Sequence, residues 1–361
     1  MKEDEVSNKG FHMPAEWENH EGTWLQWPHD GMFRGYQMKL ESIWLTMVDI
    51  LHKYERVHII VSDERHRDHV VHQLKYFNIG LETINLYIIP TNGEWARDNG
   101  PIFVVSKDGD LAITNWMFNG WGNRFEYRLD NQVPAIIGDM LSIPILNPPL
   151  TLEGGAVEVN GNGTFMATRT SIINPNRNPG KSQEEIEAII KTYLGVKHFI
   201  WLSGMAGQEC EKLGGVTDTH IDGVARFTGV STVLYNWTDN KLDPRYSLLL
   251  KHYRELQEAT TESGKPLTLV PLPIPKDGVY RINPAYWRTT TLTIASYCNF
   301  LIANGFVLVP VYGNVNDDRA KGIIAEQFPG REVVGIEAVS LVENGGMIHC
   351  VTQQQPFTTR S

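Results

Sequence analysis

The chain has 361 residues, of which 42% are hydrophobic and 20% charged, and a formal net charge of −10. This composition is typical of a soluble globular protein that can bury a sizeable core. The acidic balance argues against a nucleic-acid-binding protein, which needs a basic face, and it fits a cationic small-molecule substrate. No run of 18 apolar residues occurs, so we expect no transmembrane helix and no membrane partner.

The N-terminus and the cysteines favour a cytoplasmic protein. Residues 1–10 are polar, so we expect a disordered tail and no signal peptide. Three cysteines are few and odd in number, which favours a reducing compartment without a disulfide framework. Cys210 and Cys298 lack the glycine-rich setting of Cys350. Cys298 lies in an apolar run, residues 293–302, that predicts a helix and a core position.

The first predicted elements alternate between helix and strand. Apolar side chains recur at helical spacing between residues 36 and 54, which predicts an amphipathic helix. Residues 57–61 and 85–90 predict strands. Residues 101–105 predict the next strand, and the Lys107–Asp110 segment that follows is a hairpin turn.

The most strongly marked helix begins after Ser182. Ser182 and Glu185 have the spacing of a capping box. Apolar residues follow at helical spacing, and Gly195 is a plausible end of the helix. Further strands and helices are expected at 198–202, 225–260, 289–309 and 316–337, with a last strand from Gly346 to Thr352.

Four compact polar clusters lie beside glycines, each at the edge of a β-rich run. We interpret this as one architectural position used several times in a pseudo-symmetric assembly of sheets, although the repeat is weak in sequence. The clusters are the segments 95–101, 152–155 and 219–223, and the segment around Cys350.

Cys350 is the candidate nucleophile. An isolated late cysteine is most often a buried, inert thiol. Here Gly345 and Gly346 precede it, and glycine lets backbone come close to a ligand. A free thiol has a pKa of about 8.5, so it needs a cation or a base nearby to ionise. His220 is the natural partner, and the carboxylates nearby in the clusters could orient it.

The clusters also hold more carboxylates than a cysteine protease would need. Asp98, Glu153 and Asp222 all lie in glycine-bounded contexts, and buried carboxylates are costly unless they are paired. A guanidinium group would pair them, because it is planar, always charged and matches carboxylates with forked donors. The set therefore predicts a cysteine enzyme that attacks the central carbon of a guanidinium.

Simpler interpretations of these residues stay open. Asp98 could pair with Arg97 or cap a turn, and Glu153 could be a cap beside its glycines. His220 and Asp222 could be half of a metal site, because residues two apart on a strand face the same side. Neither Cys-x-x-Cys nor His-Glu-x-x-His is present, so we expect no metal.

In these motifs the chain resembles the agmatine deiminase and bacterial peptidylarginine deiminase family of guanidine-modifying enzymes. The resemblance extends from Met13 to Pro356. Its most specific parts are the segments 95–101, 152–155, 176–179, 217–222 and 348–356.

The resemblance implies a fold and a site. The fold is an α/β-propeller (pentein) of five ββαβ modules around a pseudo-fivefold axis, with a central active-site channel and residues 1–361 as a single catalytic domain. Cys350 would be the nucleophile and His220 the general acid and base. Asp98 and Asp222 would grip the guanidinium, and Glu153 would hold His220. Candidate substrate-binding residues are Trp95, Asp98, Asp222, Asp218 and Gly346.

The implied reaction is deimination through a covalent thiouronium on Cys350, with no cofactor. The lead substrate is agmatine, giving N-carbamoylputrescine and ammonia in polyamine biosynthesis; the alternative is free or peptidyl arginine, giving citrulline. A metal-dependent amidohydrolase and a non-catalytic arginine-binding module are more remote alternatives. A homo-oligomer is neither predicted nor excluded.

Two departures from the family pattern concern the far end of the substrate. The family stretch Gly-Asp-Glu-Thr-Asp-Gly-His is Gly214–His220 here, so the amine-binding glutamate falls on Val216. Asp218 is an acid close to that position. Gly-Gly-Gly-Asn before Ile-His-Cys is replaced by Asn344–Met347. The loop from Met205 to Gly215 is the predicted lid, from its glycines.

Overall fold

A computed structural model describes residues 9–31, 35–205, 215–281 and 292–359 of the chain. Cys210 and nearly all of the predicted lid lie outside the described residues. None of the described helices is long and apolar enough to cross a membrane.

Four of the sheets repeat one pattern: an antiparallel pair of strands, a helix, and a third strand parallel to the second. The four modules, in chain order, are β4 (Ile102–Val105), β5 (Leu111–Thr114), α6 (Val133–Leu141) and β6 (Ile145–Leu146); β7 (Glu158–Val159), β8 (Thr164–Thr168), α8 (Gln183–Leu194) and β9 (His198–Leu202); β10 (Ala225–Phe227), β11 (Thr232–Trp237), α10 (Tyr246–Glu258) and β12 (Thr268–Pro273); β15 (Leu301–Ile302), β16 (Phe306–Val311), α11 (Asp317–Gln327) and β17 (Glu332–Glu337).

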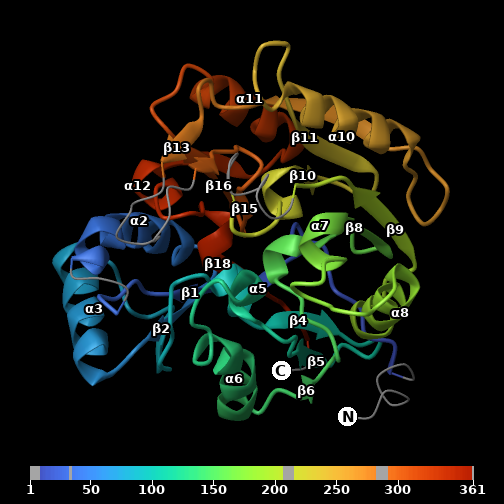
Figure 1. The fold of residues 1–361 in the computed structure, drawn as a ribbon. Coiled ribbons are helices and arrows are strands. Elements are labelled where there is room, and N and C mark those ends of the chain that lie inside the picture. The colour runs from blue at the N-terminus through green and yellow to red at the C-terminus, as the bar shows by residue number, and fades with distance from the viewer. Residues whose placement is uncertain (1–8, 32–34, 206–214, 282–291, 360–361) are drawn as a thin grey trace.

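The fifth module is built from both ends of the chain. The last strand, β18 (Thr352–Pro356), pairs antiparallel with β1 (His20–Gln26), with Leu25 opposite Thr352. Helix α2 (Tyr36–Leu51) then leads to β2 (Arg56–Val61), which is parallel to β1. Figure 1 shows β18 beside β1, with the five modules following one another around the ring. The pattern confirms the expected five-module α/β-propeller.

The remaining elements extend or connect the modules. They are α3 (Glu64–Tyr76), β3 (Ile84–Ile88), α4 (Ala96–Asn99), α5 (Gly120–Asn123), η1 (Asp130–Gln132), η2 (Gly154–Ala156), α7 (Arg169–Ile172), η3 (Ile221–Gly223), β13 (Val279–Arg281), β14 (Leu292–Ile294), α12 (Val339–Val342) and η4 (His349–Val351).

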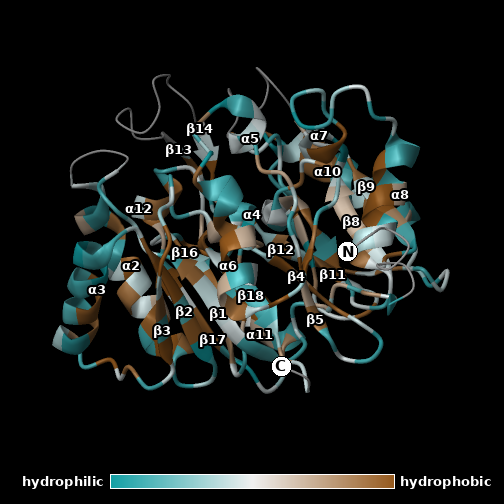
Figure 2. Cartoon of the chain, turned by 90° about the horizontal axis from the view of Figure 1, so that it is seen from below, coloured by the Kyte–Doolittle hydropathy of each residue, from teal (hydrophilic) through white to brown (hydrophobic). Residues whose placement is uncertain are grey.

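The apolar core lies between the inner strands and the outer helices. Figure 1 places α3, α6, α8, α10 and α11 on the periphery of the ring. Figure 2 shows hydrophobic colour along β2 and β16 and hydrophilic colour on the outer side of α3. Burying apolar side chains in this layer stabilises the ring, and it leaves the centre to loops and turns that carry polar side chains.

Most of the predicted elements are confirmed. Helix α8 has the expected capping box, since Ser182 and Glu185 each bond the backbone of the other, and it ends at Gly195 with a φ of 67°. Helix α2 ends at Leu51, three residues earlier than expected. The predicted turn after β4 is closed by a bond from the Ser106 amide to the Asp110 carbonyl, and the Ser106 hydroxyl accepts from the Asp110 amide.

The predicted strand from Gly346 to Thr352 is wrong. Cys350 lies in the 3-10 turn η4, and β18 begins only at Thr352. Local bonds hold this turn: the Asn299 side chain accepts from the amides of His349 and Cys350, and the Thr352 hydroxyl donates to the Ile348 and His349 carbonyls. These bonds satisfy groups that would otherwise join a β-ladder, so the thiol is directed to the centre of the ring.

The predicted helix at residues 293–302 is also wrong, although Cys298 is in the core, with 0% exposure. The segment runs from β14 through a turn at Cys298 into β15. The Arg226 guanidinium donates to the carbonyls of Cys298 and Phe300, and these bonds replace those of a helix.

A short turn precedes the first strand of every module. These turns are α4 before β4, η2 before β7, η3 before β10, η4 before β18, and the turn at Cys298 before β15. The polar clusters of the sequence lie in four of them. The architectural position predicted to repeat is therefore present. The clusters occupy short turns just before the strands rather than the strands themselves.

Candidate active site

The turns bring three charged side chains to one point at the centre of the ring. A Cβ added to Gly155 would lie 2.5 Å from His220 Nδ1, 2.8 Å from Asp98 Oδ1 and 3.1 Å from Asp222 Oδ2. Gly154 is just as constrained, because its Cβ would meet the Arg97 carbonyl at 2.0 Å. The two glycines are thus required for close approach, and they leave the space in which the three charged groups meet.

Cys350 lies between two cavities that adjoin this point. The small cavity is lined by Trp95, Asp98, Trp121, Phe125, Val216, Thr217, Asn344, Gly345, Gly346 and Cys350. The large cavity includes His220, Asp222, Asn299, Met347 and Cys350 in its lining. The thiol can therefore be reached by a ligand that contacts Asp98 on one side and His220 and Asp222 on the other.

Asp98 is held by neutral donors. The Gly155 amide donates to Asp98 Oδ1 at 3.0 Å, and the Trp121 indole donates to Oδ2 at 2.8 Å. Arg97 points away, with Nε donating to the His349 carbonyl, so the alternative in which Arg97 pairs with Asp98 is wrong. Burial raises the pKa of Asp98 to about 6, against the opposing effect of His220.

His220 is enclosed by carboxylates. Its Nε2 lies 2.8 Å from Glu153 Oε2, and its Nδ1 lies 3.6 Å from Asp98 Oδ1. Burial alone would lower the pKa of His220, but the charges of Asp98, Glu153 and Asp222 outweigh it and raise the pKa to about 9. At neutral pH the ring is therefore an imidazolium that can donate a proton.

Glu153 is ionised because an arginine pairs with it. Glu153 is 1% exposed, and Arg177 donates to both of its oxygens, from Nε at 2.6 Å and from Nη2 at 3.2 Å. Burial would raise the pKa of Glu153, but the Arg177 charge and the His220 contact lower it. Arg177 in turn donates to Asp218, which pairs with Arg124. We call Glu153, Arg177, Asp218 and Arg124 the rim network.

Asp222 is held by a second set of buried side chains, which begins with His349. His349 Nδ1 lies 2.8 Å from Asp222 Oδ2, and His349 Nε2 lies 2.8 Å from Glu16 Oε2. The buried Arg226 then joins Glu16 to Glu158, with both contacts at 2.8 Å. Although burial would raise the pKa of Asp222, His349 lowers it. We call Asp222, His349, Glu16, Arg226 and Glu158 the deep network.

The Cys350 thiol is protonated in the absence of a ligand. Burial and the negative charges of Asp222 and Asp98 raise its pKa well above the ordinary value. The Asn299 side-chain oxygen lies 3.5 Å from Sγ. A cation bound between the two aspartates would cancel the charges that oppose ionisation, so it would lower the pKa of the thiol.

Trp95 and Gly346 pack against each other in the wall of the small cavity. A Cβ at Gly346 would lie 2.1 Å from Trp95 Cζ3, so only glycine allows the ring to sit there. The Trp95 ring meets the Trp121 ring edge to face, with centroids 6.4 Å apart. Trp95 lines the pocket, as the resemblance implied.

The expectation that Asp218 contacts the substrate directly needs correction. Asp218 has 0% exposure and is absent from the lining of both cavities around Cys350. Its carboxylate accepts from Arg124 Nη1 at 2.9 Å and from Arg177 Nη1 at 2.7 Å. Its charge is therefore balanced by the buried Arg177 and the partly exposed Arg124, and it lies behind the cavity walls rather than in them.

Sequence reasoning assigned no role to Arg177, His349 or Glu16. Arg177 and His349 lie within two of the segments that carry the family resemblance, 176–179 and 348–356, and this position could have marked them as functional. Within the described ranges, no three or more His, Cys, Asp or Glu side chains are grouped so as to hold a metal ion.

Comparison with known proteins gives a consistent family. A family model described as Porphyromonas-type peptidyl-arginine deiminase matches residues 12–356. The agmatine deiminase of Medicago truncatula is 34% identical over 374 residues, covering 96% of each chain. That of Pseudomonas aeruginosa (strain LESB58) is 32% identical, again over 96% of each chain. The solved agmatine deiminase of Enterococcus faecalis is 28% identical, with a TM-score of 0.84 over 97% of both chains.

Proposed function

The chain belongs to the Porphyromonas-type peptidyl-arginine deiminase family, and we propose that it hydrolyses agmatine to N-carbamoylputrescine and ammonia. The observation that carries the proposal is the convergence of His220, Asp98 and Asp222 on one point beside the Cys350 thiol. Full-length relatives named agmatine deiminase support the choice of substrate. We place the reaction in the cytoplasm and in the synthesis of putrescine.

The guanidinium binds between the two aspartates. Asp98 and Asp222 are buried and line different cavities that both include Cys350, so a planar cation held between them can present its central carbon to the thiol. The cation also cancels the two charges that keep the thiol protonated. Substrate binding thus lowers the pKa of the thiol, whose proton passes to solvent, so the thiolate is present mainly when substrate is bound.

The reaction then proceeds in two halves. The Cys350 thiolate adds to the guanidinium carbon, the carbon–nitrogen bond breaks, and the His220 imidazolium gives its proton to the departing ammonia. A thiouronium remains on the sulfur. Neutral His220 next takes a proton from water, and the hydroxide adds to the carbon. The carbon–sulfur bond then breaks, and the hydroxyl proton passes to solvent as the neutral ureido product and the thiolate are released.

The composition of the small cavity favours free or peptidyl arginine as the second candidate substrate. Of the described residues that line it, Asp98 alone carries a carboxylate. Val216 lies in this lining, and its carbonyl accepts from the Arg124 guanidinium. Among the described lining residues the distal ammonium of agmatine therefore meets no second acid, and the Arg124 guanidinium lies behind Val216, bonded to its carbonyl.

The test is ammonia release with mass identification of the ureido product, from agmatine, free arginine and a C-terminal arginyl peptide side by side. We expect agmatine to be preferred, and Cys350→Ala to abolish turnover while binding persists. Activity that survives Cys350→Ala, or that a chelator removes, would overturn the mechanism. Preference for arginine or the peptide would instead move the assignment to the second candidate.

A further inference from the structure

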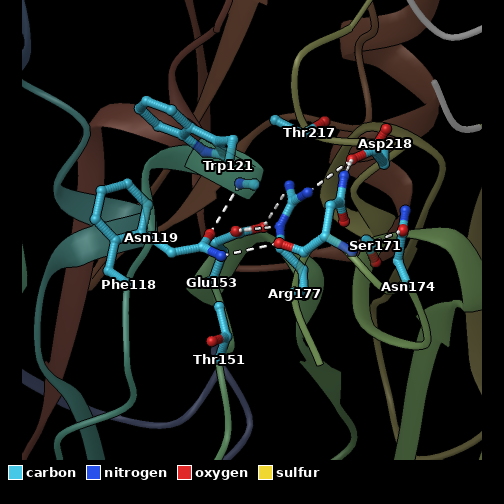
Figure 3. Close-up of polar contacts among 12 residues, drawn as sticks. Phe118, Asn119, Trp121, Thr151, Glu153, Ser171, Asn174, Arg177, Thr217 and Asp218 are labelled. Carbon is cyan, nitrogen blue, oxygen red and sulfur yellow. Dashed lines mark hydrogen bonds and ion pairs between the residues drawn. The ribbon is translucent and has the colours of Figure 1, made fainter. Parts of the chain in front are cut away.

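We propose that Arg177 is a positioning residue for His220: it fixes the orientation of Glu153 and the backbone that leads into the histidine. The inference deepens the proposed function and rests on it, because it assigns His220 the proton transfers of deimination. Figure 3 shows the Arg177 guanidinium between Glu153 and Asp218.

The contact with Glu153 fixes the plane of its carboxylate. Arg177 Nε and Nη2 each donate to a different oxygen, and neither side chain has any exposed surface. Oε2, which accepts from Nη2, is the same oxygen that lies 2.8 Å from His220 Nε2. A forked pair of bonds sets both position and angle, so the direction in which Glu153 meets His220 is set by Arg177.

The neighbours of Arg177 hold the same two segments. Asn178 accepts from the Thr151 amide and donates to the Thr151 carbonyl, both at 3.0 Å, two residues before Glu153. Asn176 donates to Asp218 Oδ2 at 2.9 Å. Three consecutive side chains therefore join the segment that carries Glu153 to the segment that leads into His220.

The backbone just before His220 adopts a conformation that needs such support. Asp218 and Thr219 have φ values of 54° and 70°, in the left-handed region that a β-branched residue rarely adopts. Strain of this kind persists where surrounding contacts over-determine it. Arg177 bonds the Asp218 side chain, and the Thr170 hydroxyl bonds the Asp218 carbonyl.

Loss of Arg177 has a defined electrostatic consequence. The carboxylates that face His220 are Asp98, Glu153 and Asp222, and the nearest cation to Glu153 besides His220 is Arg177. Without Arg177 the Glu153 carboxylate is no longer fixed 2.8 Å from His220 Nε2, so Glu153 supports the imidazolium less. The pKa of His220 then falls from about 9 towards its ordinary value of about 6.5, and His220 is deprotonated at lower pH.

The test compares Arg177→Gln and Arg177→Lys with the matched control Arg169→Gln, at an exposed arginine that bonds only Gln183 among the contacts described. For Arg177→Gln we expect kcat to fall about 100-fold, as for a catalytic group misplaced by about 1 Å. KM should change little, because Asp98 and Asp222 keep their own contacts. The alkaline limb of the kcat profile should move to lower pH, with Arg177→Lys in between.

A uniform loss of kcat with the alkaline limb unmoved would overturn the proposal. Should Arg177→Gln fail to fold, Arg177→Lys decides by the same criterion, and failure of both to fold would show a purely structural role. The His220 ring can also be titrated by nitrogen NMR without any substrate. A wild-type protein inactive on every guanidino compound would refute the proposed function, whereas an unchanged His220 titration in the variant would refute only this inference.

Discussion

The rim network and the deep network both end on carboxylates of the site that contains Cys350, and they differ in what they hold. The rim network ends on Glu153, the partner of His220, which gives up a proton in the first half-reaction and takes one in the second. It begins at Arg124, whose side chain is 16% exposed. The deep network ends on Asp222, which keeps a fixed charge, and its Arg226 has no exposed surface.

The comparison shows that the two networks have different electrostatic effects: the rim network supports the protonated form of His220, and the deep network keeps Asp222 ionised. On the rim side, Arg177 lowers the pKa of Glu153, and Glu153 helps to raise that of His220 to about 9. On the deep side, His349 and Arg226 lower the pKa of Asp222. We expect damage to the rim side to appear in proton transfer, and damage to the deep side in folding and in binding of the cation.

The largest expected effect breaks the deep network at its centre. Arg226→Met leaves Glu16 and Glu158 buried without their arginine, and removing one partner of a buried ion pair costs about 3–5 kcal/mol. Urea unfolding should show a loss of this size. The control Arg319→Met, at an exposed position on α11, should change the unfolding free energy by less than about 0.5 kcal/mol. Equal losses in the two variants would show that the network does not stabilise the fold.

A smaller effect is expected at the end of the deep network that faces the substrate. Asp222→Asn removes one of the two charges that hold the guanidinium, so kcat/KM should fall about 100- to 1,000-fold. The same change removes a charge that raises the pKa of Cys350. Iodoacetamide should therefore alkylate Cys350 faster in the variant than in the wild type at neutral pH without substrate. Slower alkylation would contradict the assigned source of that pKa shift.

The smallest effect is expected at the outer end of the rim network. Arg124 is partly exposed, and Asp218 keeps Arg177 and Asn176 when Arg124 is lost. Arg124→Gln should therefore lower the unfolding free energy by about 1 kcal/mol or less and leave the alkaline limb of the activity profile in place. A shift of that limb as large as in Arg177→Gln would mean that the rim network acts as one unit out to its exposed end.

The five-module architecture was predicted through the family resemblance, which rests on contiguous motifs, whereas the repeat itself was weak in the sequence. The same motifs carry the residues that meet near the thiol. The partners of these residues are not contiguous. His349 and Glu16 are 333 positions apart and touch only because the ring closes. The surplus of carboxylates was also only partly a sign of a cationic ligand, since Arg177 already balances Glu153.

The two wrong elements have a shared cause. The segments at 293–302 and 346–352 are apolar and short, and such runs do not distinguish helix, strand and turn by periodicity. Their conformation is set by distant side chains, Arg226 in one case and Asn299 in the other. Asp218 was misjudged for a similar reason, because the arginines that occupy its carboxylate come from two other modules.

The pairing of β18 with β1 has a consequence for the order in which the chain folds and the site forms. A chain leaving the ribosome presents β1 first and β18 last, and these strands are adjacent in the finished ring. Contacts of such long sequence separation are slow to form. Cys350 directly precedes β18, so the thiol reaches its acids only when the last strand docks. A chain without β18 is thereby kept from carrying an assembled reactive site, because the thiol is positioned only when this strand pairs with β1.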